Sequence, residues 1–191
     1  AGETCWSMIP SNTVYPGYKN YKQLQFGWEN GDQWTPAECD VSIRPGWFYH
    51  ETEDSKVKTV DQLCDLYYRS VGHNATFLLN FPVNKDGLIH PIDSANAVNF
   101  HKKIQQELSN NVLKGITPKT DSQQGKNIGK NMTDGKYDTF WASKTVKGAS
   151  IEFRLGKTQE ISRLMLQEYI PLGQRVKAFT VYYLQDKNWV K

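Results

Sequence analysis

A helical repeat that runs directly into an apolar segment is the feature that most restricts how the first half of this chain can fold. Apolar side chains recur at helical spacing at Val60, Leu63, Cys64, Tyr67 and Val71. Thr59 fits the N-cap that precedes a helix, and Gly72 fits the left-handed residue that often ends one. Residues 59–72 are therefore predicted to form an amphipathic helix.

The segment after this helix predicts a strand and a second helix. Residues 77–79 are continuously apolar, which is typical of a strand buried on both faces in a parallel sheet. The Asp86–Gly87 pair indicates a turn, and a second amphipathic helix is predicted within residues 94–112. Its apolar side consists of Ala97, Phe100 or His101, Ile104 and Leu108. Helix, strand, turn and helix in this order indicate an α/β layer or barrel.

The second half of the chain has a different periodicity. Its polar, turn-rich segments separate stretches in which apolar and polar residues alternate. The alternating apolar positions are Ile151, Phe153 and Leu155 in one stretch and Phe179, Val181 and Tyr183 in another. A two-residue period indicates strands of an antiparallel β-sandwich with one solvated face.

The change of periodicity places a domain boundary at residue 114, giving domains 1–114 and 115–191. The first domain has too few strand–helix units to close a barrel of about 250 residues. The second is shorter than the roughly 100 residues of a typical sandwich. The sequence is therefore expected to be a fragment of a longer protein.

Composition narrows the class of partner. The net charge is only +3 and the lysines form no run, so no nucleic-acid partner is expected. No apolar stretch approaches the roughly 18 residues that span a bilayer. Aromatic residues make up 13% of the chain, with 6 Trp and 10 Tyr, which suits carbohydrate recognition as well as β-rich cores. Cys5, Cys39 and Cys64 have no CxxC spacing and are expected to be buried, reduced thiols.

Two longer segments carry a family resemblance in the first half. Residues 34–50, WTPAECDVSIRPGWFYH, and residues 71–93, VGHNATFLLNFPVNKDGLIHPID, resemble the C-terminal part of the catalytic barrel in α-L-fucosidases of glycoside hydrolase family 29. Residues 1–7, AGETCWS, are similar to another segment of those enzymes. The similarity is greatest to the bacterial branch that acts on 1,3- and 1,4-linked fucose.

The second half has a resemblance of its own. Residues 131–143 and 149–183 are similar to the first part of a discoidin-like domain, as in coagulation factor 5/8 C-type domains and family 32 carbohydrate-binding modules. The resemblance implies the C-terminal portion of a (β/α)8-type barrel followed by a partial antiparallel discoidin-like β-sandwich. This is an α/β fold followed by an all-β one.

The implied function is that of a retaining exo-α-L-fucosidase, which needs no cofactor for catalysis and acts on terminal fucose of oligosaccharides or glycoconjugates. The resemblance places the nucleophilic aspartate upstream of this sequence and the acid/base glutamate shortly before Gly2. A non-catalytic fucose- or glycan-binding protein derived from such an enzyme is the alternative. A periplasmic or secreted location is expected, with the signal peptide upstream, and a cytoplasmic one stays open.

Residues 40–50 hold most of the candidate binding residues. The resemblance implies that Trp47 packs against the C6 methyl group and ring face of fucose. If this segment is extended, Phe48 points the opposite way into packing and Tyr49 returns to the side of Trp47. His50 is either a pocket donor or a structural histidine. Arg44 is either a binding residue or a structural partner of Glu38 or Asp40.

Carboxylates and one amide complete the set. Glu3 and Glu38 are candidates for catalysis, and Glu38 and Asp40 are candidates for contacting sugar hydroxyls or shaping the pocket. Asn80, at the end of the predicted strand, is either a pocket residue or an anchor for a loop.

A calcium site is implied in the second domain. The ligands would be Asp134, Asp138 and Thr139, whose hard oxygen atoms suit this ion. Lys136 stands where many relatives have an acidic or amide residue. The alternative is a simple turn, with Trp141 in the sandwich core.

Overall fold

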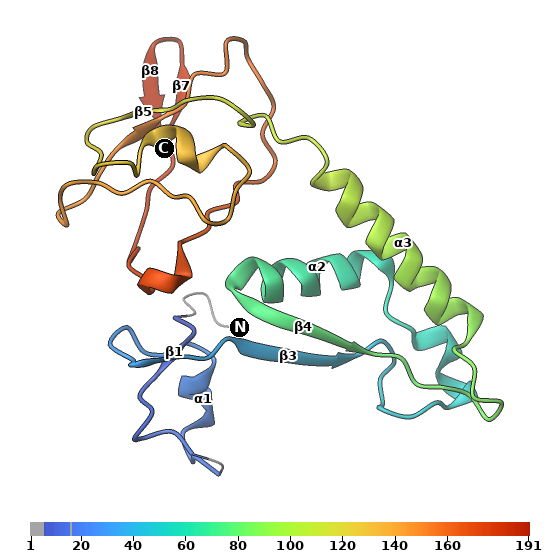
Figure 1. Ribbon diagram of the computed structural model, residues 1–191. Helices are drawn as coiled ribbons and strands as arrows, with labels where there is room; N and C mark the ends of the chain where they lie inside the picture. Colours follow the sequence, from blue (N-terminus) through green and yellow to red (C-terminus); the bar gives the residue numbers. More distant parts are fainter. Residues whose placement is uncertain (1–5, 16) are drawn as a thin grey trace. The chain divides into compact units, whose positions relative to one another are not determined.

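The computed structural model describes residues 6–15 and 17–191, which form two compact units, Ala1–Val112 and Leu113–Lys191 (Figure 1). The first unit contains β1 (Met8–Ile9), α1 (Tyr21–Leu24), β2 (Gln33–Trp34), β3 (Ala37–Ser42), the 3₁₀ helix η1 (Glu51–Lys56), α2 (Val60–Ser70), the 3₁₀ helix η2 (Val71–His73), β4 (Ala75–Asn80) and α3 (Pro91–Glu107). The second contains β5 (Lys119–Thr120), η3 (Gly129–Met132), β6 (Ile151–Glu152), η4 (Ile170–Leu172), β7 (Tyr183–Gln185) and β8 (Asn188–Val190).

A parallel pair of strands organises the first unit. β3 and β4 pair in register from Ala37 opposite Ala75 to Ser42 opposite Asn80. α2 connects them, and Figure 1 shows it lying along the pair with α3 beside it. Strand, helix and parallel strand form one βαβ unit, the repeating element of α/β layers and barrels. The prediction of mixed α/β structure is therefore confirmed.

α2 begins where the sequence predicts. The side chain of Thr59 accepts a hydrogen bond from the backbone N–H of Gln62 at 3.3 Å, and Gln62 Oε1 accepts one from the N–H of Thr59 at 2.9 Å. This reciprocal capping box satisfies two amide groups that the helix itself leaves unpaired.

The end of this helical segment differs from the prediction. Gly72 lies inside the 3₁₀ turn η2, and the left-handed residue is Asn74, with φ 62° and ψ 33°. Asparagine tolerates this conformation better than most residues. Its Nδ2 also donates to Ser7 Oγ at 2.9 Å, which holds the side chain in place. The expectation for Gly72 was therefore wrong by two residues.

The core lies between the strand pair and the helices. Ile43 and Leu63 are fully buried, Val57 is buried beside them, and Leu79, Phe81 and Phe100 pack against this cluster. The ring of Phe100 meets the rings of Phe77 and Tyr67 edge to face, at 6.3 and 6.1 Å between centroids. Val71, predicted on the apolar side of α2, is exposed because it lies in the 3₁₀ turn beyond the helix.

α3 begins earlier than predicted, at Pro91. His90 is its N-cap and accepts a hydrogen bond from the N–H of Ile92 through Nδ1 at 3.4 Å. Of the two alternatives on the apolar side, Phe100 packs inward and His101 is exposed. Leu108, predicted to be apolar packing, is exposed because it follows the last helical residue.

The two faces of the strand pair are covered unequally. Phe77 and Leu79 face the helices, while Leu78 on the other face is 49% exposed. Glu38 and Asp40 pair in register with Thr76 and Leu78, so this second face carries two carboxylates. Among the described residues, only the helix side is covered, and the prediction of burial on both faces was wrong for this chain.

A close backbone contact at Gly31 gives a test of the N-terminal segment. A Cβ atom at Gly31 would lie 2.7 Å from the nitrogen of Ile9 and 2.8 Å from the carbonyl carbon of Met8. Gly31→Ala is therefore expected to destabilise the first unit by about 1–3 kcal/mol in chemical denaturation. Gly72→Ala is the control, since its Cβ would meet only Tyr68 Cβ at 3.9 Å. Equal stability of both variants would contradict the close approach.

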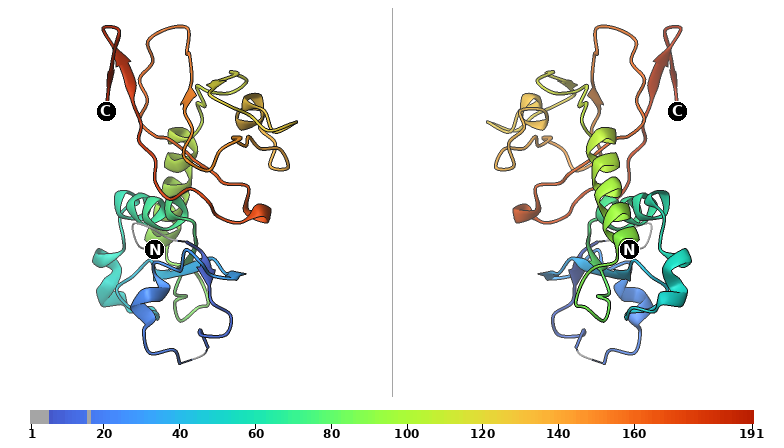
Figure 2. Two further views of the ribbon diagram at one scale, coloured as in Figure 1. Left: turned by 90° about the vertical axis from the view of Figure 1, so that its left-hand side faces the viewer. Right: turned by 90° about the vertical axis from the view of Figure 1, so that its right-hand side faces the viewer.

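The second unit has short antiparallel pairs. β5 pairs with β6, and β7 with β8. Asp186 and Lys187 both have positive φ, as in the tight turns that close two-residue hairpins, and Figure 2 shows this hairpin in red near the C-terminus. The predicted strands are much shorter than expected, because Phe179 and Val181 lie outside any ladder and are exposed. The described residues thus form one hairpin, β7–β8, and one pair of strands distant in sequence, β5–β6, and no full sandwich.

The burial of the cysteines and the length and apolarity of the helices bear on two further predictions. Cys64 is a buried thiol, and its burial raises the pKa of that thiol. Cys39 is a half-buried thiol, and Cys5 lies outside the described residues. Among the helices of the described chain, none combines the length and apolarity needed to cross a bilayer.

Candidate functional site

Two loops leave the same edge of the strand pair. Because β3 and β4 are parallel, residues 43–50 and residues 81–90 both follow the carboxyl ends of their strands. In α/β folds this edge is where ligands bind. The structure therefore brings the predicted residues of the first loop next to Asn80, and it places Glu38 and Asp40 on the exposed face of β3.

Trp47 and Phe48 are both exposed on the first loop. The side chain of Trp47 is 51% exposed and that of Phe48 is 79% exposed. The expectation that Phe48 packs inward was wrong, because the chain bends after β3 and strict alternation ends with the strand. Trp47 thus has an indole that is available at the strand edge, and its contact with a sugar stays a prediction.

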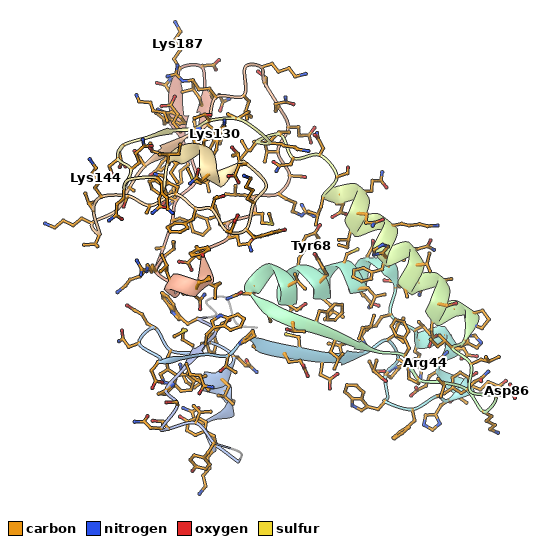
Figure 3. All side chains as sticks on the ribbon, viewed as in Figure 1. Arg44, Tyr68, Asp86, Lys130, Lys144 and Lys187 are labelled. Carbon is orange, nitrogen blue, oxygen red and sulfur yellow. The ribbon has the colours of Figure 1, made fainter. Side chains whose placement is uncertain are left out.

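Arg44 lies beneath this loop and is fully buried. Its Nε and Nη2 donate to the two carboxylate oxygens of Asp93 at 2.8 and 2.9 Å, and its Nη1 donates to Asp54 Oδ1 at 2.8 Å. Figure 3 shows Arg44 where the loop meets η1 and the start of α3. The hydrogen bond with Asp93 raises the pKa of the guanidinium, which stays charged.

These contacts correct the interpretation of Arg44. Its partners are Asp54 and Asp93, and the expected pairing with Glu38 or Asp40 was wrong. Nη1 also donates to the carbonyl of His50 at 3.3 Å, so all three guanidinium nitrogens serve this corner of the fold. Binding of a sugar by Arg44 stays untested, and its complete burial argues for the structural alternative.

Aromatic rings close the corner around Arg44. The ring of Tyr49 stacks on the guanidinium, with 4.6 Å from Cζ to the ring centroid, and lies 5.9 Å from the ring of His90. His90 Nε2 lies 3.5 Å from Asp54 Oδ2. Sequence reasoning missed Asp54, His90 and Asp93. The available signal was weak: Asp93 in the first turn of α3 is favourable at a helix N-terminus.

Asn80 is an anchor for the Trp47 loop. Its Nδ2 donates to Ser42 Oγ at 3.2 Å and to the carbonyl oxygen of Trp47 at 3.1 Å. Ser42 Oγ in turn donates to the carbonyl of Gly46 at 2.7 Å. Of the two readings for Asn80, this geometry matches the loop anchor.

The remaining candidates stay predictions. His50 has an exposed side chain, and its backbone carbonyl accepts from Arg44 and from the N–H of Glu53. Glu38 and Asp40 are exposed on β3 and could contact sugar hydroxyls on that face. Glu3 lies outside the described residues.

The calcium prediction concerns a turn in the second unit. Asp134 Oδ1 accepts from the N–H of Lys136 at 2.9 Å, and Oδ2 accepts from Thr139 Oγ1 at 2.8 Å. These hydrogen bonds lower the pKa of Asp134, with a further contribution from the nearby Lys136 charge. Both carboxylate oxygens of Asp134 thus accept hydrogen bonds within the turn, next to the charge of Lys136. The side chain of Asp138 is exposed.

The hydrogen bonds of Asp134 match the alternative of a simple turn, and calcium at Asp134, Asp138 and Thr139 stays a prediction. No cluster of three or more His, Cys, Asp or Glu side chains placed to hold a metal occurs in residues 6–15 and 17–191. Trp141, expected in a core, is half-buried, and its Nε1 donates to the carbonyl of Ser122 at 3.0 Å.

Comparison with known proteins gives this architecture a context. Residues 116–191 match the family model of the F5/8 type C domain. A crystal structure of a candidate α-L-fucosidase from Bacteroides thetaiotaomicron is 42% identical, with a TM-score of 0.91, and the match covers 100% of this chain and 42% of that one. A Ruminococcus gnavus glycoside hydrolase family 29 fucosidase, solved with fucose, is 32% identical with a TM-score of 0.70 over 82% of this chain and 32% of that one. Arabidopsis thaliana α-L-fucosidase 1 is 35% identical over 94% of this chain and 36% of its own length.

The chain thus resembles the C-terminal region of glycosidases, and its residues 116–191 match the F5/8 type C domain, which is a discoidin-like domain. The glycosidases that it resembles over both units are the α-L-fucosidases of glycoside hydrolase family 29. The chain spans between 32% and 42% of the length of these relatives.

Proposed function

We propose that the polypeptide carrying this sequence is an exo-acting α-L-fucosidase. The observation that carries the proposal is the likeness to the Bacteroides thetaiotaomicron structure, because it extends over both units with 42% identity and a TM-score of 0.91. The relative named α-L-fucosidase 1 in Arabidopsis thaliana and the Ruminococcus gnavus fucosidase solved with fucose support the same activity.

The substrate would be terminal fucose in α-1,3 or α-1,4 linkage on oligosaccharides or glycoconjugates, and the mechanism would be retaining. One carboxylate attacks the anomeric carbon, and a second carboxyl group protonates the leaving oxygen and then activates water. Both groups would lie upstream of this sequence, and Glu3 and Glu38 are the candidates within it. No cofactor takes part in this chemistry.

The share of this chain in the site is to bind the sugar. Fucose is a 6-deoxy sugar, so its methyl group favours a flat apolar wall, and the exposed indole of Trp47 offers one at the ligand-binding edge of the strands. Glu38 and Asp40 would supply carboxylates for sugar hydroxyls on the exposed face of β3, and His50 is an exposed donor on the loop. Arg44 holds this loop from below.

The first unit would belong to a (β/α)8-type barrel and the second to a discoidin-like sandwich that reaches beyond the strands formed here. The βαβ unit with its two helices on one face supports the first assignment. A periplasmic or secreted location follows from substrates that are exposed glycans, with a cytoplasmic location as the alternative.

The test uses the full-length polypeptide that contains this sequence. It is expected to release nitrophenol from 4-nitrophenyl α-L-fucoside and to cleave Lewis-type trisaccharides faster than a 1,2-linked fucoside. Proton NMR of the first product should show the α anomer of fucose, since a retaining enzyme conserves configuration. Absence of hydrolysis of every fucoside would refute the proposal, and the β anomer would refute the retaining mechanism alone.

A second candidate is a non-catalytic glycan-binding protein. The F5/8 type C domain over residues 116–191 favours it, because the likeness of that unit concerns a domain class that includes carbohydrate-binding modules. Calorimetry with fucosylated oligosaccharides separates the two candidates. Binding without turnover supports the binding protein, and turnover supports the enzyme.

A further inference from the structure

The last residues of the two parallel strands form a clasp on the Trp47 loop. Ser42 and Asn80 are paired in register at the carboxyl ends of β3 and β4. Asn80 Nδ2 lies 3.2 Å from Ser42 Oγ and 3.1 Å from the carbonyl oxygen of Trp47. The same clasp holds Gly46, whose carbonyl accepts from Ser42 Oγ at 2.7 Å. Two successive residues of the loop are therefore tied to the ends of the strands.

Only a side chain with two donors on one atom meets the geometry at position 80. The amide nitrogen of asparagine carries two hydrogens, and one goes to each of the two oxygens that face it. With the amide reversed, Oδ1 would face the carbonyl oxygen of Trp47, which cannot donate. Ser42 Oγ uses its own hydrogen toward Gly46, so it also acts as an acceptor for Asn80.

Other side chains hold the two ends of the loop, whereas Asn80 holds the backbone of Trp47 itself. Arg44 reaches the carbonyl of His50 at 3.3 Å, three residues further along. Lys58 Nζ donates to the carbonyl of Ser42 at 2.7 Å, before the loop begins. Between these two ties, the indole is half exposed, and its backbone carbonyl is bonded to Asn80. The direction in which the indole leaves the loop thus depends on this hydrogen bond.

We propose that Asn80, supported by Ser42, is a positioning residue that aims the Trp47 indole at the methyl group of the bound fucose. Asn80 does not touch the sugar and acts through the backbone of Trp47. This inference deepens the proposed function and rests on it, because it needs Trp47 to be a wall of the fucose site. It assigns part of the selectivity for a 6-deoxy sugar to an amide at the end of the neighbouring strand.

The decisive variant is Asn80→Asp in the full-length polypeptide, which keeps the shape and replaces the donor with a carboxylate oxygen. This oxygen would face two acceptors, so the loop should move away from its present position. The substrates are an aryl α-L-fucoside and its analogue that lacks the C6 methyl group. We expect kcat/KM for the fucoside to fall roughly five- to tenfold, mainly through KM, and kcat/KM for the analogue to change less than about twofold.

A double-mutant cycle separates positioning from a general structural role. In the Trp47→Ala background, Asn80→Asp should have no further effect on the fucoside, because the side chain that it positions is gone. Asn131→Asp is the matched control, since Asn131 Nδ2 likewise donates two hydrogen bonds, in its case to the backbone carbonyls of Lys126 and Phe140 in the second unit. It should leave the ratio of the two substrates unchanged.

The inference is overturned if Asn80→Asp slows both substrates equally, or if its effect persists without Trp47. Asn80→Ser, which is small and uncharged, replaces Asn80→Asp if the latter fails to fold. If the wild-type polypeptide hydrolyses no fucoside, the proposed function has failed, and amide hydrogen exchange still tests the clasp. Exchange in residues 46–50 should be faster in Asn80→Asp than in Asn131→Asp, and equal rates would rule the clasp out.

Discussion

Replacing Arg44 with methionine should lower the free energy of unfolding of the first unit more than any other single substitution described for this chain. Both Arg44 and Asp93 are fully buried, so the variant leaves an uncompensated carboxylate in the core. Breaking a buried ion pair from one side costs about 3–5 kcal/mol. For a unit of this size, that corresponds to a fall in melting temperature of at least about 12 °C. Differential scanning calorimetry on the full chain would measure it.

The double variant Arg44→Met with Asp93→Leu is the control for this explanation. Removing both charges takes away the desolvation cost along with the attraction, so the double variant should recover much of the lost stability. Asp54 should matter less, because its side chain is 28% exposed and water can solvate it. A single Arg44→Met variant that melts within 3–4 °C of wild type, about 0.5–1 kcal/mol, would show that the buried pair does not hold this corner.

Local signals in the sequence predicted the elements whose causes are local. Thr59 before the apolar repeat located the start of α2, and the structure shows that Thr59 and Gln62, three residues apart, form a capping box there. The turn at Gly87 and the strand at residues 77–79 also depend on neighbouring residues, and both are present. The end of α2 was missed because Gly72 and Asn74 both tolerate a left-handed backbone, and tertiary contact with Ser7 decides between them.

The site was harder to predict because its main contacts join distant residues. Arg44 and Asp93 are 49 residues apart, and no pattern in the sequence pairs them. The orientation of Phe48 was wrong because alternation along a strand holds only while the strand lasts, and β3 ends at Ser42. The lengths of the strands in the second unit were overestimated for a related reason. Alternating apolar and polar residues give a segment one face that can pack. The segment forms a hydrogen-bonded strand only where a partner strand lies beside it.

Removing the indole of Trp47 is the change expected to affect catalysis most. Trp47→Ala takes away the apolar wall proposed for the C6 methyl group and ring face of fucose. Losing the contacts of one large aromatic side chain costs roughly 1.5–3 kcal/mol of binding, or a ten- to hundredfold fall in kcat/KM. Because this contact exists in the bound substrate as well as in the transition state, KM should rise more than kcat falls.

Phe48→Ala provides the matched control at the next position. Its ring is 79% exposed against 51% for Trp47, and the bend after β3 gives the two side chains different surroundings. If Trp47 is the wall, Phe48→Ala should change kcat/KM for an aryl α-L-fucoside less than about threefold. Both variants replace an aromatic residue with alanine at adjacent positions of the same loop. A difference in kcat/KM between them therefore reports on the indole itself. Equal losses in both would mean that the loop as a whole matters, and a Trp47→Ala variant as active as wild type would place the fucose wall elsewhere in the protein.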